Sequence, residues 1–177
     1  MIPTLETKRL MLREILKEDA ESIYACFSND NVTRYYGQET LERMEQAEAI
    51  VAFFANSYRE KRGIRWGIEL KGKKGIIGTV GFNALSLKHK RAEIGYEIHP
   101  EHWRKGYTFE AVSKVIQYGF EELDLTRIGA VVFMENEASN KLLTRAGFQK
   151  EGILRDYMQQ NGEAQDTYVY SILRGNR

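Results

Sequence analysis

Two stretches of this sequence carry side chains whose types and spacing suit acid–base chemistry and anion binding. Glu93 and Glu97 alternate with apolar residues in "AEIGYEI", so both carboxylates project from one face of an expected strand. Arg104, Lys105 and Gly106 follow, at the point where that strand gives way to a helix-forming run. The unpaired N–H groups and positive dipole end of a helix start attract phosphate, and glycine lets the backbone approach it closely. The pattern indicates an anion site beside two carboxylates.

Each of these features also has a plainer interpretation. Paired glutamates on a strand often form only a solvated face, and a glycine between two cations often marks only an exposed turn. The histidines do not add a metal site, because His89, His99 and His102 lack the i, i+4 pairing or carboxylate company of metal ligands. The single cysteine, Cys26, predicts a buried, inert thiol. We therefore expect no metal.

The composition predicts one soluble domain spanning residues 1–177. Hydrophobic residues make up 42% of the chain, and no Pro/Gly/Ser-rich linker or repeat divides it. The sequence has neither a signal-peptide pattern nor a long apolar run, so we expect a cytoplasmic protein without a membrane partner. Its net charge is +1, which argues against nucleic acid as a partner. A nucleic-acid-binding module, suggested by "KGKKG" and "KHKR", remains the rival class.

Hydrophobic periodicity gives the elements that must position these residues. The predicted order is one strand, two helices, three strands, a helix, a strand, a helix and further strands. The three successive strands favour an antiparallel meander, and Asn136 is expected to cap the last helix, which ends before Gly147. The expected strands cover 8–15, 64–70, 76–85, 92–98, 127–133 and 167–173, and the expected helices cover 17–28, 42–62, 107–123 and 136–148.

Three stretches together resemble a known enzyme family: "AEIGYEIHPEHWRKGYTFEA", "NEASNKLLTRAGF" and "EGILRDYMQQNGEAQDTYVYSIL". They are similar to the GCN5-related N-acetyltransferases (GNAT), and specifically to the RimJ/RimL-like branch. The family's pyrophosphate loop falls on Trp103, Gly106 and Thr108, with an aromatic first position as in this branch and a threonine where a small residue is usual. The resemblance implies an α+β fold: a mixed, mostly antiparallel sheet of about seven strands, splayed in the middle, with helices on both faces.

The resemblance also implies a reaction. Acetyl-CoA would be the donor, and a primary amine would attack its thioester directly in a ternary complex. The acceptor is expected to be a protein N-terminal amine, as in ribosomal-protein acetyltransferases, while a polyamine or an amino-group antibiotic stays open. A catalytically idle acyl-CoA-binding regulator is the alternative outside enzymes. The chain would act as a monomer or homodimer.

The family pattern assigns a cofactor-binding set to this chain. Backbone groups where the strands part, at Tyr96 to Ile98, would pair with pantetheine. The loop from Arg104 to Thr108 would hold the pyrophosphate, and Asn136 and Ser139 would face the thioester. The full expected set is Tyr96, Ile98, Trp103, Arg104, Lys105, Gly106, Tyr107, Thr108, Asn136 and Ser139.

The catalytic groups are less fully matched to the family. The tyrosine that many members use as an acid falls on Leu143, and a glutamate found in the branch falls on Met158. Ser139, in the branch pattern Asn-x-x-Ser, is therefore expected to contact the departing thiolate. Glu97, more than Glu93, is expected to support deprotonation of the amine through water, because it lies nearer the loop. A substrate bound as the free amine is the alternative.

Overall fold

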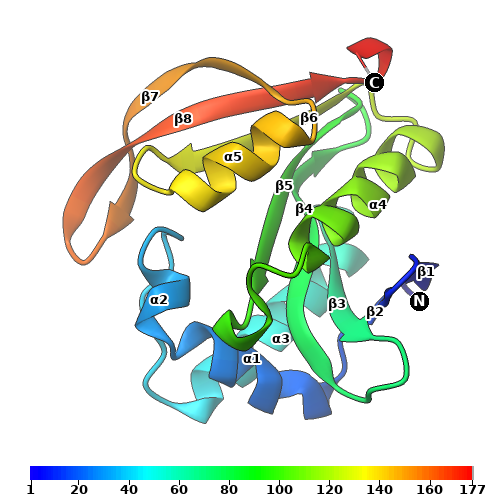
Figure 1. Cartoon of the computed structure of the whole chain (residues 1–177), viewed down its shortest axis with the longest axis vertical. Coiled ribbons are helices and arrows are strands. Elements are labelled where there is room, and N and C mark those ends of the chain that lie inside the picture. Colours follow the sequence, from blue (N-terminus) through cyan, green and yellow to red (C-terminus); the bar gives the residue numbers. More distant parts are fainter. Residues whose placement is uncertain (177) are drawn as a thin grey trace.

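A single mixed sheet runs through the computed structural model, which describes residues 1–176. Within these residues the strand order is β1-β2-β3-β4-β5-β6-β8-β7, and neighbours are antiparallel except for the parallel pair β5–β6. The sheet is therefore an antiparallel meander joined to a second antiparallel unit through one parallel contact (Figure 1). The strands are β1 Leu5–Glu6, β2 Leu10–Glu14, β3 Ile64–Leu70, β4 Ile76–Ser86, β5 Arg91–Ile98, β6 Arg127–Phe133, β7 Gln149–Gln160 and β8 Glu163–Leu173.

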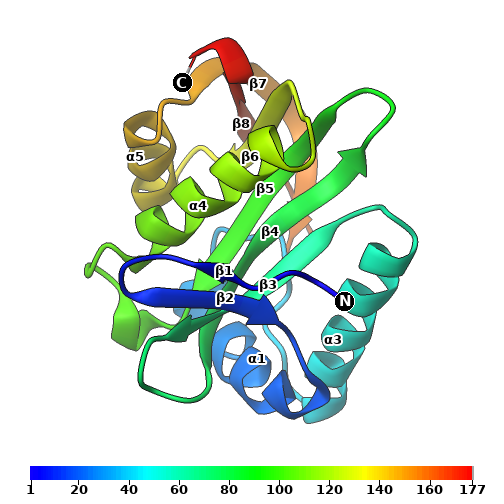
Figure 2. The same ribbon diagram turned by 90° about the vertical axis from the view of Figure 1, so that its right-hand side faces the viewer.

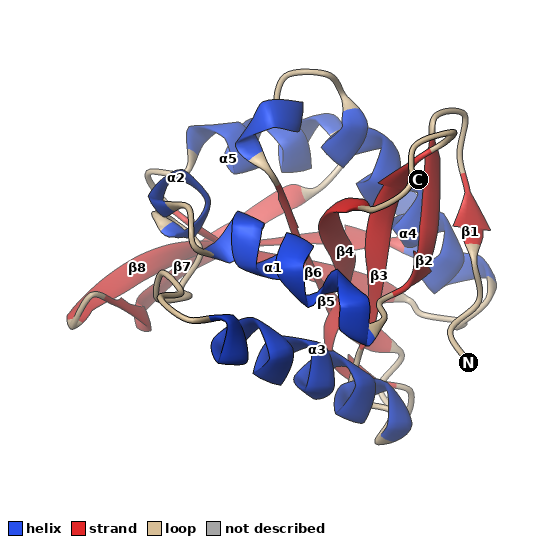
Figure 3. Ribbon diagram, turned by 90° about the horizontal axis from the view of Figure 1, so that it is seen from below, coloured by secondary structure: helices blue, strands red, loops and turns tan. Residues whose placement is uncertain are grey.

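Helices cover both faces of this sheet. Helices α4 and α5 lie on one side, while α1 and α3 lie on the other (Figures 2 and 3). The helices are α1 Ala20–Phe27, α2 Asp30–Thr33, α3 Met44–Arg59, α4 Tyr107–Glu121 and α5 Glu137–Arg145, and the 3-10 turns are η1 Lys17–Asp19, η2 Pro100–His102 and η3 Arg174–Asn176. No helix in this described part of the chain is long and apolar enough to cross a membrane.

The larger core lies between the sheet and α4. The helix is amphipathic, and its buried stripe packs on the inner faces of the central strands. Gly119 belongs to this stripe because a Cβ there would lie 2.7 Å from Phe82 Cζ and 3.1 Å from Ile128 Cδ1. The close contact fixes α4, and with it the loop that precedes α4. The buried residues of the stripe are Ala111, Val112, Val115, Ile116, Gly119 and Phe120.

A smaller core holds α1 and α3 against the other face. Ile23 and Phe27 of α1 pack with Ala47 and Val51 of α3 around Ile76 of β4. Cys26 is buried in the same region, as predicted, and its thiol lies 3.6 Å from the carbonyl oxygen of Ile77. Burial raises the pKa of this thiol well above its usual value, so it stays protonated and unreactive.

The sequence-based elements agree closely with the observed ones. The strands at 64–70 and 127–133 match β3 and β6 in full. The described chain has eight strands rather than about seven. The six strand ranges predicted from the sequence omit β1, which comprises two residues, and β7, whose side chains are mostly exposed and show no apolar alternation. The four-residue helix α2 was not predicted because it is too short to show a period, although Asn29 caps it by accepting from the N–H of Asn31 at 2.9 Å.

Candidate active site

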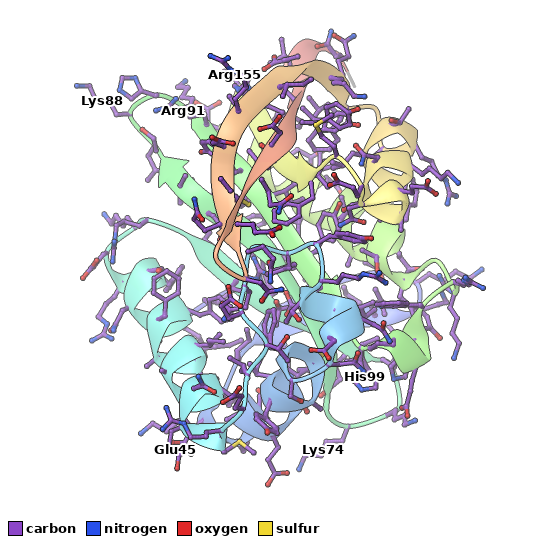
Figure 4. All side chains as sticks on the ribbon, turned by 90° about the vertical axis from the view of Figure 1, so that its left-hand side faces the viewer. Glu45, Lys74, Lys88, Arg91, His99 and Arg155 are labelled. Carbon is purple, nitrogen blue, oxygen red and sulfur yellow. The ribbon has the colours of Figure 1, made fainter. Side chains whose placement is uncertain are left out.

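The parallel strands β5 and β6 separate after a short paired stretch. They pair from Arg91 with Arg127 to Glu93 with Gly129, and β5 then continues to Ile98 without β6 (Figure 1). Figure 4 labels Arg91 at the paired end of β5 and His99 just beyond the open end. The separation confirms the splayed sheet that the family resemblance implied.

Alternation along β5 decides which backbone groups face this gap. The N–H of His99 donates to the carbonyl oxygen of Ile77 at 2.8 Å, so the odd-numbered residues of β5 direct their backbone groups toward β4. Tyr96 and Ile98 therefore direct theirs toward the gap. The carbonyl oxygen of Ile98 accepts a hydrogen bond from Trp103 Nε1 at 2.8 Å. This leaves the backbone of Tyr96 and the N–H of Ile98 facing the opening.

The loop after β5 ends in an uncapped helix start. Gly106 is the N-cap of α4, has a φ of 80° and provides no side-chain cap, so the first N–H groups of the helix point outward. Arg104 is also left-handed, with a φ of 61°, a strained conformation that is typical of functional loops. The exposed side chains of Arg104 and Lys105 add positive charge. Tyr107 and Thr108 begin the helix, so this segment suits a pyrophosphate.

Arg9 holds this loop in place, a role that the sequence did not reveal. Its Nη1 donates to the carbonyl oxygen of Lys105 at 2.8 Å, and its Nε donates to Glu110 Oε1 at 2.8 Å. The guanidinium also lies 4.5 Å from the centre of the Tyr107 ring. A Cβ on Gly106 would come within 3.2 Å of Arg9 Nη2. The positive charge of Arg9 thus lies against the turn at Lys105 and Gly106.

The start of α5 faces β5 across the gap. Asn136 caps this helix as predicted, because its Oδ1 accepts from the N–H of Ser139 at 3.2 Å. The hydroxyl of Ser139 is hydrogen-bonded to the phenol of Tyr96, at an O–O distance of 2.5 Å. Leu143 is buried in the core and carries no polar group. Ser139 and Tyr96 therefore place two hydrogen-bonded hydroxyls on this side of the gap.

Glu97 lies on the opposite face of β5 and is buried in a polar cluster. Its Oε2 accepts from Arg65 Nη2 at 2.7 Å and from the Tyr36 hydroxyl at 2.9 Å. Its Oε1 accepts from the hydroxyl of Thr79, which in turn accepts from Arg65 Nε at 2.9 Å. A carboxylate has about four acceptor positions, so these three contacts leave one position unused on a side chain that is only 2% exposed.

Burial and ion pairing act in opposite directions on Glu97. Burial is the larger effect and raises the pKa of the carboxyl above its ordinary value, while Arg65, Thr79 and Tyr36 favour the carboxylate. The pKa of Tyr36 also rises because of burial, so its phenol stays a donor. A raised pKa makes Glu97 a stronger base than an exposed glutamate.

Glu93 has different surroundings. It pairs in register with Gly129 at the last paired position of β5 and β6, and its charge favours protonation of Arg127. The two predicted carboxylates therefore share a face, but only Glu97 lies beside the open part of β5. Arg65 and Thr79 were missed in the sequence. A charged residue inside the apolar strand "IRWGIEL" was the signal for a buried ion pair.

A cavity of about 360 Å³ opens beside the Glu97 cluster, between α3 and the edges of β3 and β4. Arg65 borders both the cavity and Glu97. Arg65 Nη1 and Asn83 Nδ2 lie over β5, 2.7 and 2.8 Å from where a Cβ of Gly95 would be. The described lining contains aromatic and basic groups and no carboxylate: Phe53, Phe54, Ser57, Arg62, Gly63, Ile64, Arg65, Phe82, Asn83, Ala84 and Leu85.

The described residues hold no cluster of three or more His, Cys, Asp or Glu side chains that could bind a metal. The residues present do fit a coenzyme A thioester. The uncapped helix start suits its pyrophosphate, the parted strand offers backbone groups for an extended amide chain, and Ser139 lies at the α5 end of the same gap.

The chain is similar in sequence and fold to known acetyltransferases. The family model described as an acetyltransferase (GNAT) domain matches residues 9–149. A Bacillus subtilis protein described as the uncharacterized N-acetyltransferase YoaA is 63% identical over 98% of this chain and 98% of its own. The putative ribosomal N-acetyltransferase YdaF of the same organism is 35% identical over 72% of this chain and 68% of its own. A structure of spermidine N-acetyltransferase from Vibrio cholerae with CoA and spermine has a TM-score of 0.84 at 27% identity, covering 96% of this chain and 98% of that one.

Proposed function

Because this chain belongs to the GNAT family of acetyltransferases, we propose that it transfers the acetyl group of acetyl-CoA to the N-terminal amine of a protein. Acetyl-CoA supplies an activated acyl group, and the amine attacks it directly within a ternary complex. The donor would lie along the α4 and α5 side of the gap, and the amine would arrive from the Glu97 side.

Three groups of residues would bind the three parts of acetyl-CoA: the pantetheine arm, the pyrophosphate and the thioester. The backbone of Tyr96 and Ile98 pairs with the pantetheine arm. The turn from Arg104 to Thr108 holds the pyrophosphate, with Trp103 fixed against the carbonyl oxygen of Ile98. The start of α5, where Asn136 fixes the position of Ser139, meets the thioester. An N–H facing the gap stabilises the developing oxyanion.

The acceptor must lose a proton before or during attack. Glu97 takes this proton through a water bound at its remaining acceptor position, and its raised pKa suits the task. Arg65, Tyr36 and Thr79 hold the carboxylate in place. Glu93 lies farther from the open gap and acts, at most, on the field around it.

The observation that carries the choice of acceptor is the cavity beside Arg65. A polyamine has several positive charges, and arginines in a binding site repel each of them. The described lining of this cavity contains two arginines, three phenylalanines and no carboxylate. Such walls suit the single amine and apolar side chains of a peptide N-terminus. A polyamine acceptor is the second candidate, since one structural neighbour is described as a spermidine N-acetyltransferase.

An acetyl-CoA-dependent thiol-release screen tests this proposal. The acceptors are peptides with a free N-terminal amine, the same peptides with a blocked amine, spermidine and an aminoglycoside. We expect the highest kcat/KM with a free peptide and no turnover with its blocked form. Turnover confined to spermidine or the aminoglycoside would overturn the acceptor assignment. Binding of acetyl-CoA without turnover of any amine would instead indicate a regulator.

A further inference from the structure

The phenol of Tyr96 lies in an unusual place for a residue whose backbone borders a substrate gap. Its main-chain groups face the opening between β5 and β6, while its hydroxyl reaches α5 and bonds Ser139 at 2.5 Å. The side chain thus connects the two walls of the gap at the residue expected to meet the sulfur. The family pattern assigned Tyr96 a backbone role alone.

The hydroxyl of Ser139 is not needed to cap helix α5, because Asn136 already does so. A serine in the first turn of a helix commonly satisfies a backbone N–H. Here Asn136 Oδ1 accepts from the N–H of Ser139 at 3.2 Å, so Asn136 already supplies the side-chain cap. The hydroxyl of Ser139 is left for other contacts, and it lies against Tyr96.

The direction of this hydrogen bond follows from the chemistry of the two hydroxyls. A phenol is a stronger acid than an alcohol, so Tyr96 is the better donor and Ser139 the acceptor. Burial raises the pKa of Tyr96 to about 12, so the phenol keeps its proton at neutral pH. Either hydroxyl can be the donor in this contact, and with the phenol as donor the proton of Ser139 is free to point away from Tyr96.

We propose that Tyr96 is a positioning residue that orients the hydroxyl of Ser139 toward the sulfur of the acetyl donor. When the amine nitrogen bonds to the carbonyl carbon and the carbon–sulfur bond breaks, the electron pair goes to sulfur. Ser139 donates a hydrogen bond to that thiolate, and Tyr96 holds Ser139 in the orientation that allows it. The proton lost by the new amide leaves on the Glu97 side. The pair takes the place of the acid that Leu143 cannot supply.

A titration of bound CoA tests this without any acceptor amine, so it does not depend on the proposed acceptor. CoA is bound at saturation to the wild type, Tyr96→Phe, Ser139→Ala and the double variant, and thiolate absorbance is followed against pH. Because Ser139 stabilises the bound thiolate, Tyr96→Phe should raise the thiol pKa by about one pH unit, the worth of one hydrogen bond. Ser139→Ala should raise it at least as much, and the double variant should match Ser139→Ala.

Tyr170→Phe is the matched control. The Tyr170 phenol donates to Asn140 Oδ1 on the same helix at 2.5 Å, so this variant also removes a bond between the sheet and α5. It should leave the thiol pKa unchanged. The proposal fails if Tyr96→Phe leaves the thiol pKa at the wild-type value, or shifts it equally in the Ser139→Ala background. It also fails if Tyr96→Phe changes only the CoA affinity measured by calorimetry, because Tyr96 would then only stabilise the position of α5.

Discussion

Glu97 combines three properties that a base on this strand needs: burial, a place beside the gap and an acceptor position that Arg65, Tyr36 and Thr79 leave open. Glu93 has the same orientation but lies where β5 and β6 are still paired. The difference between two identical side chains four residues apart therefore comes from the point at which the strands separate.

A pH–rate profile distinguishes these two carboxylates. In the wild type, kcat/KM should rise with pH as Glu97 loses its proton. Glu97→Gln should abolish this limb and lower the neutral rate by roughly 10²-fold, the usual contribution of a general base. Glu93→Gln should keep the wild-type profile.

Thermal unfolding must accompany this comparison, because Glu97→Gln leaves the buried Arg65 without its anion. Full activity of a folded Glu97→Gln together with loss of activity in Glu93→Gln would assign the base to Glu93 instead. If neither substitution matters, the substrate or bulk water supplies the base.

The proposed binding of the pyrophosphate depends above all on Gly106. Its left-handed backbone and missing side chain leave the start of α4 open. Gly106→Glu should abolish CoA binding in calorimetry, because a side chain at this positive φ is strained, crowds the Arg9 guanidinium that holds the turn and adds a negative charge to the loop. Gly162→Glu is the control, since Gly162 has a similar φ of 78° in an open turn. Unchanged CoA affinity in a folded Gly106→Glu protein would refute the assignment.

At the scale of the elements, helix α4 packs closely on the sheet through Gly119 in its last turn. Helix propensity alone favours alanine over glycine by about 1 kcal/mol. A Cβ at Gly119 would nevertheless clash with Phe82 and Ile128 in the core, and overpacking typically costs about 1–3 kcal/mol. Gly119→Ala should therefore lower the free energy of unfolding in urea. Gly152→Ala, where a Cβ meets nothing within 4 Å, should change it by less than about 0.5 kcal/mol. A stabilised Gly119→Ala would contradict the close packing of α4.

A surface network ties the three strands beyond the gap. Glu151 of β7 accepts from Arg127 of β6 at 2.8 and 2.7 Å and from Ser171 of β8 at 2.6 Å. The hydrogen bonds from Arg127 lower the pKa of Glu151 to about 2 from an ordinary value of 4.5. The stabilisation is thus present above pH 4.5 and is lost as pH falls toward 2.

Urea unfolding of the wild type and Glu151→Gln at several pH values tests this network. The difference in unfolding free energy should be largest near neutral pH and vanish at the acid end. It should be modest, because solvent screens these partly exposed side chains. A difference that is constant across this range would show that the charge of Glu151 contributes nothing.

The sequence predicted those features that arise from neighbouring residues and did not predict those that arise from contacts between distant residues. The periods of β3, β6 and α4 are local, and so is the cap at Asn136, which is why they were found. The cluster around Glu97 joins residues 14 to 61 positions apart, and the Arg9 contacts with the loop and the start of α4 span about a hundred positions. Strand alternation predicts that Glu97 shares a face of β5 with Glu93, but its partners Arg65, Tyr36 and Thr79 become apparent only in the folded sheet.

At the scale of the whole molecule, the proposed reaction places the two substrates on opposite faces of the sheet. The hydroxyls of Tyr96 and Ser139 meet on the α4 and α5 side, while Glu97, Arg65 and the cavity lie on the other side. The parted strands are the opening through which an amine on one face can reach an acyl group on the other. With a net charge of +1, the molecule attracts neither substrate by its overall field, so recognition is local.

The most direct measurement of acceptor choice is a competition read by tandem mass spectrometry. The wild-type protein is given acetyl-CoA, equal amounts of spermidine and a peptide that contains both a free N-terminal amine and an internal lysine. The carboxylate-free cavity predicts acetylation of the peptide ahead of spermidine, with the acetyl group on its N-terminal nitrogen. Acetylation of spermidine while the peptide stays unmodified, or acetylation of the lysine alone, would contradict it.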